Sequence, residues 1–209
     1  MPQINWIGGS PCAGKTTISH IIGQEFDWQI YHIDRNFERY LQRANVVQHP
    51  HLIQYKNLGL QQFLLQDPHW QLEQVKGISK EQFEFILEDI AELPADKPIL
   101  VEGANLRVAD VIQQIQTPSQ AIWLVPTEAF QLETYPKRGS WVQDVLRHHY
   151  EPDDAVVAFE RWMQRDALMA EWTANEAESQ EIPVIRVDGT VPLLDNAEIV
   201  MRHFGLLES

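Results

Sequence analysis

The eight residues from Gly9 to Thr16 have the clearest potential for chemistry in this chain. They match the pattern G-x-x-x-x-G-K-[ST], in which glycines let a loop curl so that successive backbone N–H groups face a phosphate. A short run of strand-forming residues precedes the segment and a helical pattern follows it, so the positive end of a helix dipole lies beside it. The residues expected to contact a nucleotide are Gly9, Ser10, Pro11, Cys12, Ala13, Gly14, Lys15, Thr16 and Thr17.

Two side chains of this loop have the chemistry to bind a nucleoside triphosphate. The ammonium group of Lys15 can neutralise β- and γ-phosphate oxygens, and the hydroxyl of Thr16 can bind a Mg²⁺ ion that bridges them. Cys12 is expected to contribute its backbone rather than its thiol. The loop therefore predicts ATP and Mg²⁺ as cofactors, although the motif does not distinguish ATP from GTP.

Two carboxylates follow predicted strands. Asp34 comes after residues 28–33, and Glu102 comes after residues 99–101. Ligands of open α/β sheets gather at the carboxyl ends of the strands, where either carboxylate could accept a proton from an attacking hydroxyl. Glu102 could also hold Mg²⁺. The alternatives are a helix N-cap for Asp34 and a surface turn for Glu102, and spacing alone does not separate base from metal ligand.

Three arginines directly after Asp34 recur four residues apart and so share one helix face: Arg35, Arg39 and Arg43. In an acidic chain, such a face suits an anionic acceptor molecule. The alternative is a solvated face with local ion pairs. Asn105 and Arg107 closely follow Glu102, and they complete the residues expected to contact the acceptor.

A second group of arginines consists of Arg138, Arg161 and Arg165. The helix predicted from residue 152 has one apolar stripe, formed by Val156, Phe159, Met163 and Ala170. Arg161 and Arg165 then lie on nearly the opposite face. Guanidinium groups that close over a transferring phosphate stabilise its charge and exclude water. The alternative is ion pairing with neighbouring acidic residues.

The elements that must position these residues alternate between strands and helices. Strands are predicted over residues 4–7, 28–33, 99–101, 121–125 and 184–187, with helical patterns between them. This alternation favours right-handed crossovers and an α/β fold with a mostly parallel sheet. Two helical insertions are expected, at about residues 36–95 and 135–165. The clearest helix of the first begins at Ser79, with an earlier start indicated by Asp67 and Pro68.

Composition narrows the classes of function. The chain has 209 residues and a formal charge of −14, and its length suits one domain over residues 1–209. The negative field repels nucleic acids and anionic membrane surfaces, and no apolar run approaches the roughly 18 residues of a membrane span. A single cysteine and the absence of a leader pattern predict a cytoplasmic protein, as a monomer or homodimer.

The phosphate-binding loop, Asp34, Glu102-Gly103 and the closing segment 187–190 together resemble the small P-loop kinases of the nucleoside and nucleotide kinase-like superfamily. The resemblance implies a P-loop NTPase fold: a three-layer α/β/α sandwich with a five-stranded parallel sheet of order 2-3-1-4-5. It also implies a helical acceptor-binding insertion after the second strand and a later lid over ATP. A departure is that Gly103 stands alone, where shikimate kinases have paired glycines.

The same resemblance implies roles for individual residues. Asp34 is similar to the aspartate that binds the acceptor hydroxyl in shikimate and gluconate kinases, and Glu102 is similar to a glutamate of uridine-kinase-like members. Arg161 and Arg165 match lid arginines, and the loop with Asp188 and Gly189 is expected near the adenine.

Two functions are consistent with the sequence. The first is a phosphotransferase that moves the γ-phosphate of ATP to a hydroxyl or phosphate of a small hydroxylated metabolite, with an anionic one among the candidates, or of a nucleoside or nucleotide. Lys15, Asp34, Glu102, Arg161 and Arg165 would be its catalytic residues, with Thr16 and Glu102 at the metal. The alternative is a nucleotide-binding switch that signals to a protein partner through its helical insertion. The first is favoured because two polar insertions flank the loop, which suits two substrates that must meet.

Overall fold

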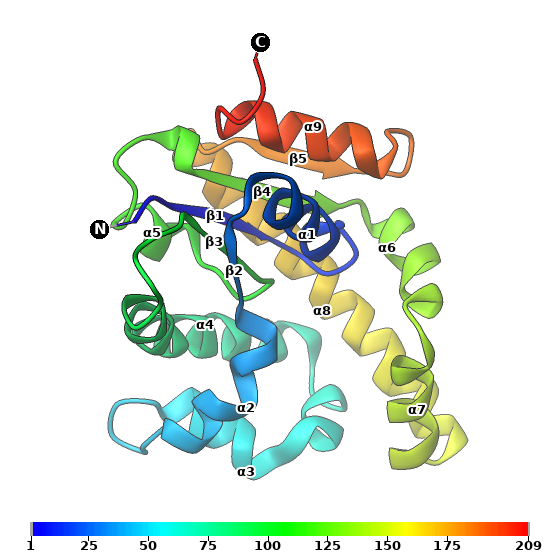
Figure 1. The fold of residues 1–209 in the computed structure, drawn as a ribbon. Helices are drawn as coiled ribbons and strands as arrows, with labels where there is room; N and C mark the ends of the chain where they lie inside the picture. Colours follow the sequence, from blue (N-terminus) through cyan, green and yellow to red (C-terminus); the bar gives the residue numbers. More distant parts are fainter. Residues whose placement is uncertain (1, 209) are drawn as a thin grey trace.

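A computed structural model describes residues 2–208, apart from the side chains of Ser140 and Trp141, and its centre is a parallel sheet (Figure 1). The strands are β1 (Ile4–Gly9), β2 (Gln29–His32), β3 (Ile99–Glu102), β4 (Ala121–Pro126) and β5 (Val184–Val187). Their order is β2-β3-β1-β4-β5 and every adjacent pair is parallel. This confirms the predicted α/β class and strand order. The second strand ends one residue earlier than expected, because Ile33 begins a helix.

Helices cover both faces of the sheet and make three layers. On one face, α1 (Lys15–Phe26) and α9 (Leu193–His203) pack against alternate strand residues such as Ile7 and Ile122. On the other face, Trp6 and Trp123 share a core with parts of the helical insertion and of α8 (Pro152–Ser179). Strand side chains alternate between the two faces, so these two cores lie on opposite sides of the sheet.

Three helices form the first insertion: α2 (Ile33–Arg43), α3 (Pro50–Leu64) and α4 (Pro68–Ala91). The Asp67 side chain caps α4 by accepting hydrogen bonds from the backbone N–H groups of His69 at 3.0 Å and Trp70 at 3.1 Å. The start at Ser79 was therefore the wrong one of the two signals, because Ser79 is buried within a continuous helix. Gly59 interrupts α3 with φ +74° and bends it.

The second insertion contains α6 (Glu128–Thr134), the 3₁₀ turn η2 (Tyr135–Lys137) and α7 (Ser140–His149), and it leads into α8. Two shorter elements, α5 (Val108–Val111) and the 3₁₀ turn η1 (Pro118–Gln120), connect β3 to β4. The apolar stripe expected on α8 is confirmed at Met163 and Ala170, which are buried, and is wrong at Val156, which is 58% exposed. The buried face also includes Trp162, Asp166 and Met169. Its neighbours on α3, α4 and α7 determine which face is covered.

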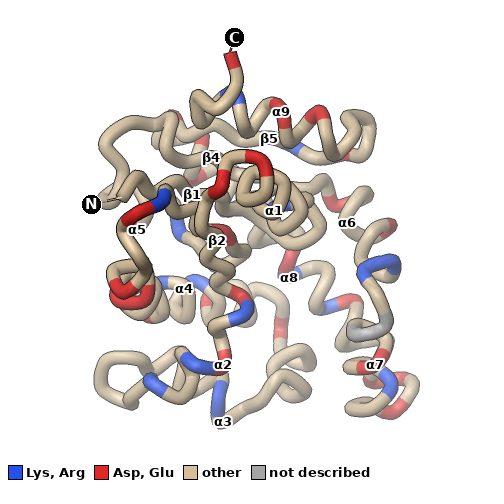
Figure 2. Tube along the Cα trace, viewed as in Figure 1, with Lys and Arg blue, Asp and Glu red and all other residues tan. Residues whose placement is uncertain are grey.

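Acidic side chains are spread over the helices around the sheet (Figure 2). None of the helices within residues 2–208 has the length and apolar character that crossing a membrane requires.

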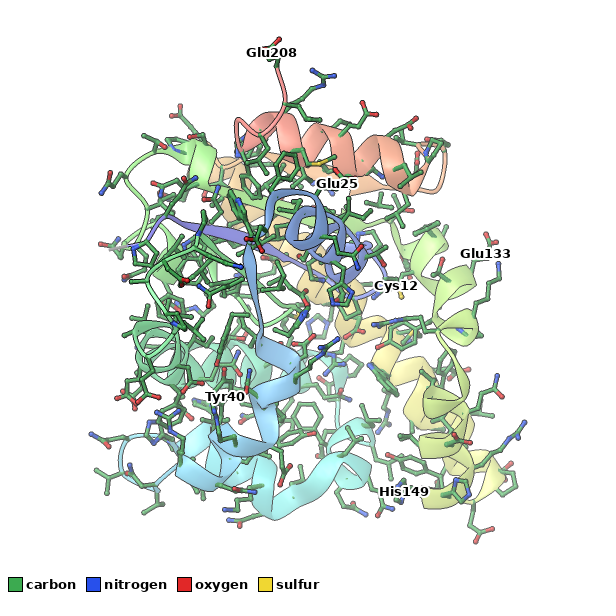
Figure 3. The ribbon with its side chains drawn as sticks, in the orientation of Figure 1. Cys12, Glu25, Tyr40, Glu133, His149 and Glu208 are labelled. Carbon is green, nitrogen blue, oxygen red and sulfur yellow. The ribbon has the colours of Figure 1, made fainter. Side chains whose placement is uncertain are left out.

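A buried carboxylate on α4 joins the first insertion to the sheet. Asp89 accepts hydrogen bonds from the Tyr31 hydroxyl at the edge of the sheet and from the guanidinium groups of Arg39 and Arg43 on α2, the last at 2.9 Å. The Tyr31 and Tyr40 hydroxyls lie 2.5 Å apart in the same network, and Figure 3 shows Tyr40 on α2. Asp89 is 9% exposed, whereas the Arg39 side chain is 51% exposed, so the carboxylate is shielded from water while the network extends to the surface.

We expect Asp89→Ala to lower the free energy of unfolding by about 3 kcal/mol, because it leaves two arginines and a tyrosine without their shared acceptor. Glu88→Ala is the matched control: Glu88 also pairs with Arg43, but its side chain is 64% exposed, so its loss should cost less than about 1 kcal/mol. Thermal unfolding of the two variants measures both effects. Equal losses in the two proteins would contradict a central role for Asp89.

Candidate active site

The predicted phosphate-binding loop, residues 9–16, has a backbone shape that requires its glycines. Gly9 and Gly14 have φ values of +125° and +84°, and Cys12 between them has φ +73°. A Cβ on Gly9 would lie 1.9 Å from the carbonyl oxygen of Leu124 on β4. The backbone N–H of Ser10 donates to that same carbonyl at 3.2 Å, so the loop is attached to β4 where it leaves the sheet.

Lys15 is a buried cation at the start of α1. Its side chain is 6% exposed, and its Nζ donates to the Ser10 carbonyl across the loop at 2.7 Å. Burial lowers the pKa of Lys15, while the nearby carboxylates of Asp34 and Glu102 oppose that shift. No side chain caps the N-terminus of α1. The backbone N–H groups of its first turn are therefore left for an anion.

Glu102 ends β3 beside the loop and is 3% exposed. Its Oε1 accepts a hydrogen bond from Thr16 Oγ1 at 3.1 Å and one from His32 Nδ1 at 2.6 Å. Burial alone would raise the pKa of the Glu102 carboxyl, but the His32 hydrogen bond and the charge of Lys15 outweigh it and hold that pKa below its usual value. The buried Oε2 has no hydrogen-bond partner among the described residues. Glu102 is therefore an ionised carboxylate with one oxygen held and one available.

His32 was not identified from the sequence as a site residue. It is the last residue of β2, and it is in register with Glu102, the last residue of β3. Since an ionised carboxylate only accepts, His32 Nδ1 donates to Glu102, and His32 Nε2 lies 3.2 Å from His20 Nε2 on α1. The signal was present in the sequence: two adjacent parallel strands each end in a polar residue.

Asp34 lies in the first turn of α2, rather than at its N-cap, and the backbone N–H of Ala104 donates to its carboxylate. The side chain opens to solvent on one side, and protein atoms crowd the carboxyl on the others. This crowding raises the pKa of Asp34, although the charge of Lys15 opposes the rise. Asp34, Glu102 and Lys15 are thus close enough to interact electrostatically, as their positions at strand ends suggested.

Arg138 is the one of the three arginines predicted for a lid that lies near the loop. It follows η2, its guanidinium lies 5.4 Å from the centre of the Tyr135 ring, and its charge acts on Lys15 and Asp34. Burial raises the pKa of the Cys12 thiol even though Arg138 opposes it, so this thiol is protonated near neutral pH. Figure 3 shows Cys12 on the side of the loop nearest α6.

The other two lid arginines have protein partners. Arg161 donates to the backbone carbonyl of Leu65, which ties α8 to the end of α3. Arg165 pairs through Nε with the buried Asp166 carboxylate at 2.6 Å. Burial raises the pKa of Asp166, and Arg165 lowers it. Neither guanidinium has a partner in the phosphate-binding loop among the contacts of the described residues, although Ser10 Oγ donates to the Asp166 carbonyl at 3.3 Å.

Four arginines were expected to contact the acceptor: Arg35, Arg39, Arg43 and Arg107. Arg39 and Arg43 belong to the Asp89 network, and Arg35 lines a groove beside them at the β2 edge. Arg107 lies 3.6 Å from Asp110 and so forms a local ion pair. Arg39 and Arg43 therefore form ion pairs, as the alternative interpretation held, but with a buried carboxylate of another helix rather than with local partners on a solvated face.

Three further predicted residues, Asp188, Gly189 and Asn105, lie in two loops. The Asp188 carboxylate accepts hydrogen bonds from the N–H and hydroxyl of Thr190 at 2.9 and 2.6 Å, and Gly189 has φ +86°. This is a tight turn after β5 that is stabilised by its own side chains. Asn105 follows β3 and lines a cavity beside the loop. Within the described residues, no group of three His, Cys, Asp or Glu side chains could hold a metal ion by itself.

We expect His32→Leu to raise the pKa of Glu102, because burial then acts without its strongest opponent. His32→Asn should keep the pKa low, since its amide can replace Nδ1 as the donor. Carboxyl-carbon NMR titration of the metal-free variants measures this difference. An unchanged Glu102 pKa in His32→Leu would show that the 2.6 Å contact has no electrostatic importance.

No family model matches this chain, and no curated protein matches it in sequence. Among solved structures, a gluconokinase from Sinorhizobium meliloti 1021 is 13% identical, with 98% of this chain and 91% of that chain covered and a TM-score of 0.49. Shikimate kinase from Acinetobacter baumannii in complex with shikimate is 16% identical over 97% and 92% of the two chains, with a TM-score of 0.46. Deoxyadenosine kinase from M. mycoides with bound dATP is 14% identical over 98% and 100%, with a TM-score of 0.49.

Proposed function

We propose that this protein is an ATP-dependent phosphotransferase that acts on a hydroxyl group of a small molecule. The observation that carries the proposal is the arrangement of Lys15, Asp34 and Glu102, in which a buried cation of a phosphate-binding loop interacts with two carboxylates of unlike environment. A loop that only bound a nucleotide would need no second, solvent-facing carboxylate. Phosphoryl transfer needs a group to orient the acceptor and take its proton.

The donor side of the reaction is the loop. Its backbone N–H groups and the N-terminus of α1 would bind the phosphates, and Lys15 would neutralise charge on the transferring group. Thr16 and Glu102 fit a magnesium ion, because their donors are oxygens and Oε2 of Glu102 is buried without a partner. The ion would supply charge neutralisation at the β- and γ-phosphates when bound.

The two carboxylates are given different roles by their surroundings. Asp34 is accessible to solvent and its pKa is raised, which suits a base that accepts the proton of an acceptor hydroxyl. The Glu102 pKa is lowered and its Oε1 is held by two donors, which suits a permanently ionised ligand at the metal. Arg138 would close over the phosphates as η2 and α7 move toward the loop, and would exclude water.

The test of the donor site is Lys15→Ala, with Lys97→Ala as control. Lys97 forms an exposed ion pair with Asp27 far from the loop. We expect Lys15→Ala to reduce ADP formation by at least about 100-fold, because the substitution removes the positive charge that neutralises the transferring phosphate. Lys97→Ala should match the unmodified protein. The assay follows Mg²⁺-dependent ADP release with panels of small hydroxyl compounds. ATP binding with no compound able to stimulate turnover would contradict the proposal and favour a switch.

The division of roles predicts opposite phenotypes for the two carboxylates. Asp34→Asn should keep the affinity for Mg²⁺ and ATP while acceptor-dependent turnover falls by about 100-fold or more. Glu102→Gln should weaken the dependence of ATP binding on Mg²⁺, because it removes a charged oxygen ligand. Calorimetric titration with ATP, with and without Mg²⁺, separates the two. If Asp34→Asn rather than Glu102→Gln lost the Mg²⁺ dependence, the assignment would be reversed.

A further inference from the structure

A cavity of about 190 Å³ lies between the first insertion and α8, beside the phosphate-binding loop. Four rings line it, and we call it the aromatic pocket after them: Phe37, Tyr55, Phe63 and Trp162. Pro11 of the loop and Ala104 after β3 also line it. Ala104 is also the residue whose N–H donates to Asp34, the carboxylate proposed as the base, so this one residue contacts both Asp34 and the aromatic pocket.

The rings of the first insertion form one continuous wall. Phe37 and Tyr55 meet edge to face with their centres 5.3 Å apart, and Tyr55 and Phe63 do so at 5.1 Å. The bend at Gly59 lets side chains from both halves of α3 line the same cavity. A wall of aromatic faces and edges is complementary to another flat ring, because such pairs gain more than their buried area alone provides.

The polar groups of the aromatic pocket are few and carry no excess charge. Arg165 lines it, but its charge is balanced by Asp166, which lines it too. The side-chain amide of Asn105 makes no hydrogen bond to any described residue, so it offers one donor pair and one acceptor to a ligand. The cations once expected for an anionic acceptor, Arg39 and Arg43, are bound to Asp89 instead.

From these observations we propose that the acceptor is an uncharged hydroxyl compound with a single flat, unsaturated ring. The ring lies in the aromatic pocket, Asn105 bonds its polar edge, and the hydroxyl points to Asp34. The volume of 190 Å³ exceeds the roughly 150 Å³ of a cavity that holds benzene, which leaves room for one ring and a short substituent. This inference rests on the proposed function and specifies its substrate.

Transfer of the γ-phosphate needs no reactant other than ATP and the acceptor. The acceptor oxygen forms a bond to the γ-phosphorus as the bond from that phosphorus to the bridging oxygen of ADP breaks. The hydroxyl proton goes to Asp34 and then to water. Sugar acids and polyols would lose their hydrogen bonds with water on entering a pocket whose walls are mostly apolar.

Binding and turnover are measured separately to test this. Saturation-transfer NMR on the nucleotide-free protein compares neutral ring alcohols (pyridylmethanols, hydroxymethylpyrimidines and pyrimidine nucleosides) with shikimate and gluconate. Leu60→Trp fills the aromatic pocket, and Leu58→Trp, two residues away in a different surface groove, is its control. We expect ring alcohols alone to bind, with affinity at least tenfold weaker in Leu60→Trp and in Asn105→Ala and unchanged in Leu58→Trp.

ADP release with the same compounds distinguishes a failure of the substrate inference from a failure of the proposed kinase function. Stimulation by shikimate or gluconate but not by ring alcohols would overturn the substrate inference and leave the kinase function intact. Equal ring binding in Leu60→Trp and the unmodified protein would also overturn it. Ring binding without ADP release would overturn the kinase function and, with it, the role of the ring compound as acceptor.

Discussion

The arrangement of the whole site depends on the close backbone contact between β1 and β4. A Cβ on Gly8 would lie 2.3 Å from the Trp123 ring, and one on Gly9 would meet the Leu124 carbonyl oxygen. Only glycine lets the first strand leave the sheet at this point. The loop then turns back at the carboxyl end of the central strand and starts α1 at Lys15. The buried ammonium group of Lys15 donates a hydrogen bond to the loop carbonyl of Ser10. Every other element of the site is positioned relative to this turn.

The second constraint is parallel register. β3 lies between β1 and β2, and Glu102 pairs with Ile7 on one side and His32 on the other. The carboxyl ends of these three adjacent strands therefore bring the loop, Glu102 and His32 next to one another. Gly103 follows at a point where a Cβ would lie 2.8 Å from Ile33. Its missing side chain lets the start of α2 approach β3, and this approach brings Asp34 to the Ala104 N–H.

The sequence was most informative where chemistry is local. The loop and the five strands follow from glycine placement and apolar runs, whose consequences extend over a few residues. The arginines show where this stops. Spacing by four establishes that Arg39 and Arg43 share a helix face, but Asp89, 46 residues beyond Arg43, determines what they meet. Likewise, Arg161 faces a carbonyl supplied by α3. Predicting such partners requires the packing of helices that no local pattern encodes.

Carboxylates balance the buried cations of this molecule, and this balance limits which charged ligands it can bind. The chain carries a formal charge of −14, and its buried cations are matched by carboxylates: Lys15 by Asp34 and Glu102, and Arg165 by Asp166. A bare triphosphate would therefore meet a repulsive field. A triphosphate that carries a divalent cation has less negative charge, and backbone N–H groups bind it without adding a formal charge. An acceptor that brought its own negative charge would find no such compensation in the aromatic pocket. The balance of charge thus favours a metal-bound donor and a neutral acceptor meeting at Asp34.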